Sequence, residues 1–163
     1  MRHARSEDQA SSDFARELSP SGRSDANRMT AHFASQPQVH RPRWLVTSAA
    51  VRAEQTSDYV ASGFALSATQ RVSEPALYLA SPETIVSTLK ETPDSIDCVA
   101  LVAHNPGLTW LINSWSSRSN SPQETLDNLP TMGCALFQTD ISSWADLATA
   151  RRASLMTPKM LAD

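Results

Sequence analysis

Apolar residues in this sequence gather in short runs, separated by longer stretches in which they recur at helical spacing. The runs 44–47 and 98–103 have the length and composition of β-strands. The run 98–103 is apolar throughout, which is the pattern of a strand buried on both faces of a parallel sheet. Three weaker strands are predicted at residues 69–73, 133–137 and 154–156.

Helices are predicted between these strands. Ser19 followed by Pro20 is typical of a helix N-cap and first helical residue, and the apolar spacing after it predicts a helix to about Ser35. A Ser-Pro pair at 81–82 and an Asn-Pro pair at 105–106 predict two more helix starts by the same rule. Further helical segments are predicted after Ser48 with an end at Gly63, near Pro122–Asn128, and as a turn or short helix at Ser143–Leu147.

Strands that alternate with helices define the expected fold. The pattern predicts an α/β three-layer sandwich with a mostly parallel central sheet flanked by helices. The length of 163 residues suits a single domain over 1–163. No run approaches the roughly 18 apolar residues that a membrane span needs, and the N-terminus is too polar for a secretory signal. We therefore expect a soluble, cytoplasmic protein.

Composition excludes several classes of function. A net charge of −3 argues against a nucleic-acid binder, which is usually basic. Cys98 and Cys134 lie in apolar runs and neither has a CxxC partner, so they predict two buried thiols rather than a zinc or redox site.

Candidate chemistry lies where predicted strands end, because ligands of open α/β sheets bind beyond the carboxyl ends of the strands. Arg52 falls in the first helical turn after the strand 44–47, and His104 directly follows the strand 98–103. If Arg2 and His3 also follow a strand, the same crevice collects two arginines and two histidines. Together with helix N-termini, these groups predict a pocket for phosphate or another small oxyanion.

Arginine and histidine side chains in such a pocket suit the transfer of a phosphoryl group. Arginine holds phosphate oxygens in bidentate pairs, and neutral histidine is a nucleophile that can carry a phosphoryl group. The sequence contains no Gly-x4-Gly-Lys-Ser/Thr loop and no Cys-x5-Arg loop, which excludes a P-loop nucleotide site and a cysteine phosphatase. No carboxylate cluster suggests a metal-dependent phosphatase.

Three motifs together carry a resemblance to a known family. Arg2-His3-Ala4 resembles the RHG/RHA motif of the histidine phosphatase superfamily, and residues 48–56 resemble its Ser-x-x-x-Arg-Ala-x-(Gln/Glu)-Thr signature. Residues 102–107 resemble its Gly-His-Asn-Pro stretch, with Ala103 where glycine is common. The stretches Asp13–Leu18, Glu74–Ala80, Leu129–Thr131 and Ser143–Leu147 are similar to the SixA-type phosphohistidine phosphatases of this phosphoglycerate mutase-like superfamily.

The resemblance implies a role for each candidate site residue. His3 would be the catalytic nucleophile that becomes phosphorylated, and water would then release phosphate. Arg2, Arg52 and His104 would be catalytic as well, because they hold the transferring group. The implied phosphate-binding residues are Arg2, Arg16, Arg52 and His104. Glu74 is a possible proton donor, with a loop-ordering hydrogen bond as its alternative role. The family uses no metal and no cofactor.

The N-terminus departs from the family pattern. Members place an apolar strand before the Arg-His pair, whereas Met1 alone precedes it here. The first strand is therefore expected to be truncated, and a start site assigned too far downstream is the hypothesis that would account for it. A chain that begins at Met1 would carry its catalytic pair on a fraying end, with weak stability and little activity.

Three functions remain open at this point. The leading one is a metal-independent phosphatase that works through phospho-His3 and dephosphorylates phosphohistidine on a signalling protein. The second is a phosphomonoesterase for small phosphorylated metabolites. The third is a phosphate-binding pseudoenzyme, suggested by the truncated start. Partners are expected to be a phosphorylated protein or a small phosphoester, with no nucleic acid and no membrane, and the chain is expected to be a monomer.

Overall fold

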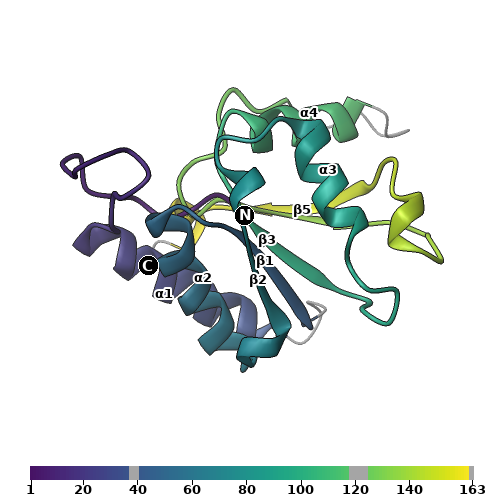
Figure 1. Cartoon of the computed structure of the whole chain (residues 1–163), viewed down its shortest axis with the longest axis horizontal. Coiled ribbons are helices and arrows are strands. Elements are labelled where there is room, and N and C mark those ends of the chain that lie inside the picture. The colour runs from purple at the N-terminus through teal and green to yellow at the C-terminus, as the bar shows by residue number, and fades with distance from the viewer. Residues whose placement is uncertain (37–40, 118–124, 162–163) are drawn as a thin grey trace.

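The computed structural model describes residues 1–36, 41–117 and 125–161, and its centre is a parallel three-stranded sheet. The strands lie in the order β2 (Arg71–Glu74), β1 (Trp44–Ser48) and β3 (Val99–Val102). Helices α1 (Pro20–Ser35) and α2 (Val51–Phe64) cover one face, and α3 (Pro82–Lys90) and α4 (Gly107–Ser117) cover the other (Figure 1). The expected three-layer α/β architecture is confirmed.

The register of the sheet brings the carboxyl ends of its strands to one edge. Ser48 at the end of β1 pairs with Glu74 at the end of β2, and Thr47 pairs with Val102 at the end of β3. The loops that leave these strands therefore start side by side, which is the arrangement that an active site needs.

Two further strands form a separate antiparallel pair. Strands β4 (Cys134–Gln138) and β5 (Arg151–Met156) correspond to the weaker strands predicted near the C-terminus. A short 3-10 helix at Trp144–Asp146 lies in the connection between them, as expected. Of the helix predicted near Pro122–Asn128, residues 122–124 lie outside the described part, and residues 125–128 are not helical.

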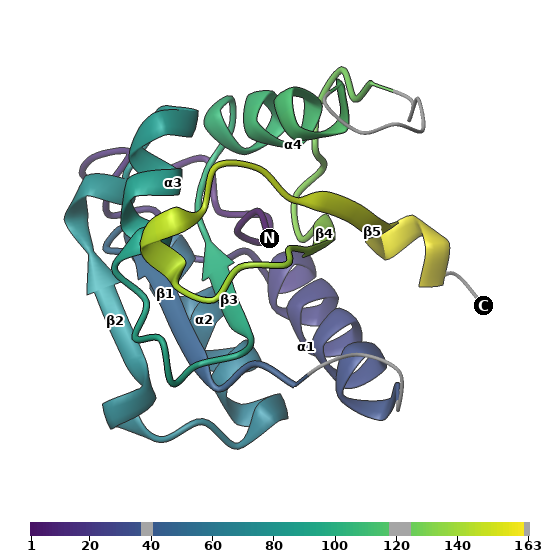
Figure 2. The ribbon, with the colours of Figure 1, turned by 90° about the vertical axis from the view of Figure 1, so that its right-hand side faces the viewer.

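The first three residues lie between β3 and the segment that leads into β4. Arg2 pairs in parallel with Ala103, and the Met1 amine donates to the Leu101 carbonyl at 2.8 Å. On the other side, the Arg2 N–H donates to the Gly133 carbonyl at 2.9 Å. In Figure 2 the N-terminus accordingly lies between β3 and β4. The backbone around the Arg-His pair is thus bonded on both sides.

Two helix boundaries differ from the prediction. Ser19 caps α1 as expected, since its Oγ accepts from the Gly22 N–H at 3.1 Å. Helix α4, however, begins at Gly107 rather than Pro106, because the Asn105 side chain does not cap it and instead donates to the Leu129 carbonyl at 2.9 Å.

Helix α2 continues through Gly63, where the sequence predicted its end. The helix runs to Phe64, and Ala65 takes the left-handed conformation with φ of 56°. A Cβ at Gly63 would lie 2.2 Å from Cγ2 of Thr30. Glycine is therefore required here for the close packing of α2 on α1, not for a turn.

Apolar side chains fill both interfaces between the layers. The cluster on the α3 and α4 side includes Ile85, Leu108, Leu111 and Trp115. On the other side, Met29 and Phe33 of α1 pack near Leu45 and Val60. No helix in the described part of the chain is long and apolar enough to cross a membrane.

Candidate active site

A pocket of about 290 Å³ opens at the carboxyl edge of the sheet. His3 follows the Arg2–Ala103 pairing, Arg52 lies in the first turn of α2, and His104 follows β3. The lining residues are Arg2, His3, Asp13, Arg16, Arg52, Leu79, His104 and Asn105. The structure thus brings together every residue that the sequence assigned to the phosphate pocket.

His3 is held as a neutral imidazole whose Nε2 carries no proton. Its Nδ1 lies 2.8 Å from the carbonyl oxygen of Ala4, which can only accept, so Nδ1 carries the proton and donates it. Burial, opposed by this bond and reinforced by the positive charge of Arg52, lowers the pKa of His3 to about 4. Nε2 therefore keeps its lone pair, and the Arg52 Nε–H donates to it at 3.3 Å.

His104 faces His3 across the pocket, with ring centroids 4.9 Å apart. Its Nε2 lies 2.8 Å from Oγ of Ser48, while its Nδ1 is buried and has no partner among the described residues. Burial, with the nearby His3 and Arg52, lowers the pKa of His104 to about 3. If the Ser48 hydroxyl donates to Nε2, the proton on Nδ1 is left to donate to an oxyanion.

Arg52 is almost fully buried, with 3% of its surface exposed, and Asp13 holds its outer edge. Its Nη1 donates to the Asp13 carbonyl and its Nη2 to Oδ2 of Asp13 at 2.9 Å. With the bond to His3, three of the five N–H donors of this guanidinium are committed to the protein. Two donors remain for a ligand.

The other two arginines of the pocket, Arg2 and Arg16, are also bonded to the protein. Arg2 donates from Nη1 to the Leu129 carbonyl at 2.7 Å, and its buried Nε has no partner among the described residues. Burial and then the charge of Arg52 lower the pKa of Arg2. Arg16 donates from Nη1 to Oδ1 of Asp13 at 3.1 Å and from Nε to the Glu7 carbonyl at 2.7 Å.

Asp13 is a pocket residue that sequence reasoning missed. Its carboxylate contacts Arg52 and Arg16 and accepts from the Tyr78 hydroxyl at 2.7 Å. The Tyr78 hydrogen bond, followed by Arg52, lowers the pKa of Asp13 to about 2. The spacing of Asp13 and Arg16 was a usable signal, because residues three apart can pair in one turn. Nothing in the spacing pointed to Tyr78.

Glu74 lies apart from this group. Its carboxylate accepts from the Ala76 N–H at 2.8 Å and caps the 3-10 helix at Pro75–Leu77. Glu74 does not line the pocket. The geometry therefore matches the alternative role that the sequence left open for it, a hydrogen bond that orders the loop.

The pocket combines a nucleophile with donors for a tetrahedral oxyanion. Nε2 of His3 shares the pocket with three guanidinium groups, and Arg2 and His104 each carry a buried nitrogen without a hydrogen-bond partner among the described residues. Donors placed around a transferring phosphoryl group stabilise the charge that it develops. Among the described residues, no three histidine, cysteine or acidic side chains gather as a metal site.

The arrangement of sheet, helices and pocket defines the fold of the histidine phosphatases, which are phosphoglycerate mutase-like α/β proteins. Within that class, the chain has the fold of the SixA phosphohistidine phosphatases. The putative SixA from Nakamurella multipartitia matches with a TM-score of 0.79 and 24% identity over 97% of this chain and 93% of its own. The putative SixA from Agrobacterium tumefaciens matches with a TM-score of 0.78 and 23% identity over 97% and 95%.

Two other solved structures extend the comparison. A protein histidine phosphatase SixA complexed with tungstate matches with a TM-score of 0.79 and 22% identity over 99% of this chain and 97% of its own. A mycobacterial glucosyl-3-phosphoglycerate phosphatase matches with a TM-score of 0.66 and 15% identity over 93% and 94%. No protein-family model and no curated protein sequence matches the chain. The comparisons thus establish the fold.

Proposed function

We propose that this chain is a metal-independent phosphatase in which Nε2 of His3 accepts the phosphoryl group. The observation that carries the proposal is the state of His3: neutral, with Nδ1 donating to Ala4 and the unprotonated Nε2 accepting from Arg52 at the pocket. A neutral imidazole in this setting is a nucleophile at neutral pH, and the surrounding cations favour a phosphorylated state.

The proposed reaction has two steps. The phosphoryl oxygens bind the remaining donors of Arg52 and those of Arg2 and His104, which places phosphorus in line with Nε2 of His3. The bond from phosphorus to the substrate breaks as the bond to Nε2 forms, and the leaving nitrogen takes a proton from solvent. Water then attacks phosphorus, the P–Nε2 bond breaks, phosphate leaves, and the proton of the water passes to solvent.

The substrate class we propose is phosphohistidine on a signalling protein. Imidazole is a good leaving group, so such a substrate does not require a proton donor from the protein. Glu74 does not line the pocket and does not provide one. The pocket is accessible at Leu79, which is 53% exposed, and Phe14, which packs against Tyr78, is 40% exposed. The similarity in fold to a protein histidine phosphatase, which was solved with the oxyanion tungstate, supports the same class.

A second candidate is hydrolysis of small phosphorylated metabolites. The fold similarity to a glucosyl-3-phosphoglycerate phosphatase favours it, although the TM-score of 0.66 is lower. An alcohol leaving group needs a general acid, and the arrangement of Glu74 speaks against that reaction. We also propose that the enzyme is cytoplasmic and monomeric.

The decisive experiment compares wild type, His3→Ala and the matched control His32→Ala, which changes a histidine of α1 away from the pocket. Turnover of a phosphohistidine protein is expected to fall by about three orders of magnitude or more in His3→Ala and to stay unchanged in His32→Ala. When the substrate carries a labelled phosphoryl group, rapid quenching is expected to leave the label on the wild-type enzyme in a form that is labile in acid and stable in base. Equal turnover by His3→Ala and wild type would rule out the mechanism.

The same preparations separate the substrate classes. Turnover of the phosphohistidine protein, with slow turnover of an aryl phosphate and of sugar phosphates, is the expected result. Turnover of metabolite esters alone would select the second candidate. Tight phosphate binding with no turnover of any substrate would instead identify a binding protein.

A further inference from the structure

Leu79 is the apolar residue of the candidate active site. Among the described residues that line the pocket, it alone has no charged or polar group on its side chain. The two pocket histidines are buried, whereas Leu79 keeps about half of its surface exposed. A residue that both lines a pocket and is exposed lies at its mouth. A group attached to an anion in the pocket would therefore meet Leu79 on its way out.

The backbone of Leu79 has an unfavourable conformation for leucine. Tyr78 has φ of −68° and ψ of 114°, Leu79 has φ of 51°, and the Ala80 N–H donates to the Leu77 carbonyl at 3.4 Å. These are the features of a type II β-turn, whose third residue is usually glycine or asparagine because its φ is positive. In a residue such as leucine, this conformation brings Cβ too close to a carbonyl oxygen.

Two other non-glycine residues in the described part of the chain have positive φ, Ala65 and Met132. Met132 is fully buried in an apolar cluster, so its packing offsets the cost of the conformation. Ala65 has a small side chain and caps α2. Leu79 has a large side chain and stays half exposed, so burial offsets less of its cost. Strain of this kind is typical of binding and catalytic sites.

Contacts with the rest of the fold hold the turn at the pocket. Leu77 and Ala80, its first and last residues, are buried in the apolar cluster on the α3 and α4 side. The Ala80 carbonyl lies against the first residue of α4, where a Cβ on Gly107 would be only 1.9 Å from its oxygen. The Tyr78 hydroxyl donates to Asp13 at 2.7 Å. The third residue of the turn is therefore displayed at the pocket mouth.

The chemistry of the pocket divides a ligand into two parts. Arginine, histidine and asparagine side chains suit the phosphoryl group, and a leucine side chain does not. Leucine stabilises a bound group that removes apolar surface from water, such as the face of an aromatic ring. A sugar ring would instead lose hydration of its hydroxyl groups against the same side chain.

We propose that Leu79 is a specificity-determining residue that contacts the leaving group of the substrate. It selects a flat aromatic ring bonded directly to the phosphoryl group, which in the substrate is the imidazole of phosphohistidine. The assignment of that ring to phosphohistidine rests on the function proposed above, whereas the contact between Leu79 and a ring does not.

The first test measures binding of two stable phosphonates, phenylphosphonate and methylphosphonate, by calorimetry. Wild type is expected to bind phenylphosphonate about fivefold more tightly, because the ring buries apolar surface against Leu79. Leu79→Asn is expected to remove most of this preference and to change the affinity for methylphosphonate by less than about twofold. Leu79→Met, which returns an apolar side chain, is expected to recover most of the preference.

Thermal stability separates this role from a structural one. Asparagine tolerates positive φ better than leucine, so Leu79→Asn is expected to have a thermal midpoint no lower than wild type. The matched control is Ala65→Asn, at an exposed residue with the same backbone conformation, at the opposite end of α2 from Arg52. Its thermal midpoint is also expected to be no lower than wild type, and its preference for phenylphosphonate should be unchanged.

The second test compares turnover of phosphoimidazole and phosphoramidate, which both have a P–N bond and differ in the ring. In Leu79→Asn, kcat/KM is expected to fall about fivefold for phosphoimidazole and less than about twofold for phosphoramidate. A loss for an aryl phosphate with none for phosphoimidazole would overturn the assignment to imidazole and indicate a phenol leaving group.

Several outcomes would overturn the inference. These are an equal effect of Leu79→Asn on both phosphonates, no binding of either phosphonate at millimolar concentration, or a clearly lower thermal midpoint of Leu79→Asn. Turnover that needs His3 but is unchanged in Leu79→Asn would overturn this inference alone. A preference for phenylphosphonate that depends on Leu79, in a protein without turnover, would support the contact and overturn only the chemistry proposed for His3.

Discussion

His3 is neutral in this pocket because burial and three nearby arginines oppose its protonation. The same groups that would hold a phosphoryl dianion thus keep the nucleophile in its reactive form. The hydrogen bond from Nδ1 to Ala4 fixes the tautomer, since a carbonyl can only accept. One residue thereby satisfies two requirements of nucleophilic catalysis, protonation state and orientation.

The acid limb of the pH–rate profile follows from this state. The neutral form of His3 is the active one, and its pKa is about 4. The kcat/KM of the free enzyme is therefore expected to stay high as pH falls through 6.5 and to decline only near pH 4. Steady-state kinetics over pH 3.5–8 would check this, after stability at each pH is verified. A decline of kcat/KM already near pH 6.5 would contradict the environment described for His3.

Asp13 is the acidic side chain among the residues that line the pocket. It bonds to both Arg52 and Arg16, so an arriving oxyanion meets a carboxylate on the same guanidinium groups. Asparagine at this position keeps an acceptor for Arg52 and Tyr78 and removes the charge.

Asp13→Asn is accordingly expected to raise the affinity for phosphate or tungstate by about fivefold, the scale of an exposed charge pair. Calorimetric titration would measure it. The matched control is Asp25→Asn, because Asp25 pairs with Arg28 on α1 away from the pocket. Unchanged or weaker anion binding by Asp13→Asn would mean that the carboxylate orients Arg52 more than it repels the ligand.

At the scale of elements, local rules predicted the starts of α1 and α3 and the end of α1. Ser19 and Ser81 cap their helices as predicted, because the cap bond needs residues within one turn only. The end predicted at Gly63 was wrong, because what decides that position is the approach of Thr30 from another helix. Pro106 likewise precedes α4, because Asn105 bonds to Leu129 across the fold.

Gly63 provides a prediction at this scale. Gly63→Ala would place a Cβ 2.2 Å from Cγ2 of Thr30 and force α1 and α2 apart. We expect a loss of about 1–3 kcal/mol in the free energy of unfolding, measured with urea. In the control Ser62→Ala, at an exposed position of the same helix, the change should stay within about 0.5 kcal/mol. A stabilised Gly63→Ala would show that helix propensity outweighs the contact.

At the scale of the molecule, the buried histidines link stability to pH. His3 and His104 have folded pKa values of about 4 and about 3, below the 6.5 of an ordinary histidine. Between pH 4 and 6.5 the unfolded state therefore binds more protons, and stability falls as pH falls through this window. Asp13, with a pKa lowered to about 2, stabilises the fold above about pH 4, and this contribution is lost only as pH falls below that value. It therefore does not offset the loss of stability that the two histidines cause.

The thermal midpoint is thus expected to drop by about 5–10 °C from pH 7 to pH 5. His3→Gln, which cannot titrate, should show a smaller drop even if it is less stable at pH 7. Differential scanning calorimetry at the two pH values would measure both proteins. An equal drop of the thermal midpoint in His3→Gln and wild type would mean that other groups govern the loss of stability at low pH.

The sequence by itself determined the strands, the starts of α1 and α3, and the arginines and histidines that line the oxyanion pocket. Arg52 and His104 were identifiable because each follows a strand directly, and chain connectivity alone carries it to the carboxyl edge of the sheet. These features depend on neighbours close in sequence, whose geometry the backbone fixes.

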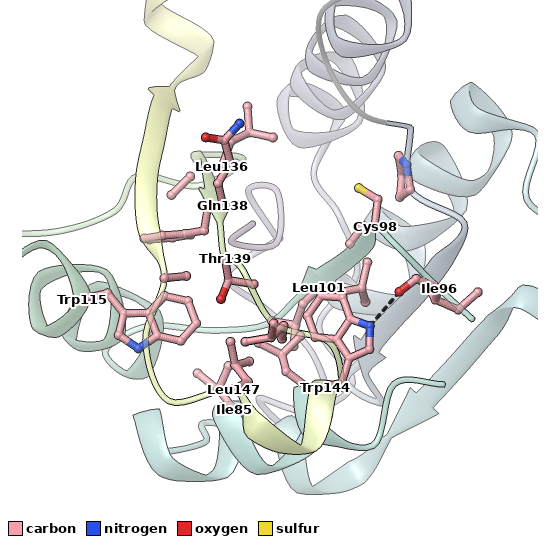
Figure 3. A pocket seen from close by; sticks show the side chains of 18 of the residues that line it. Ile85, Ile96, Cys98, Leu101, Trp115, Leu136, Gln138, Thr139, Trp144 and Leu147 are labelled. Atoms are coloured by element: carbon pink, nitrogen blue, oxygen red, sulfur yellow. Dashed lines mark hydrogen bonds between the residues drawn. The ribbon is translucent and has the colours of Figure 1, made fainter. Parts of the chain in front are cut away.

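Only the tertiary structure decided the rest. Asp13 reaches Arg52 and Tyr78 across 39 and 65 residues, a contact that no local spacing encodes. The run Cys98–Ala103 predicted a strand buried on both faces, yet Val99, Ala100 and Leu101 are only partly buried because they line a cavity between β3 and β4 (Figure 3). Burial depends on which segments pack against a strand, and that follows from the fold as a whole.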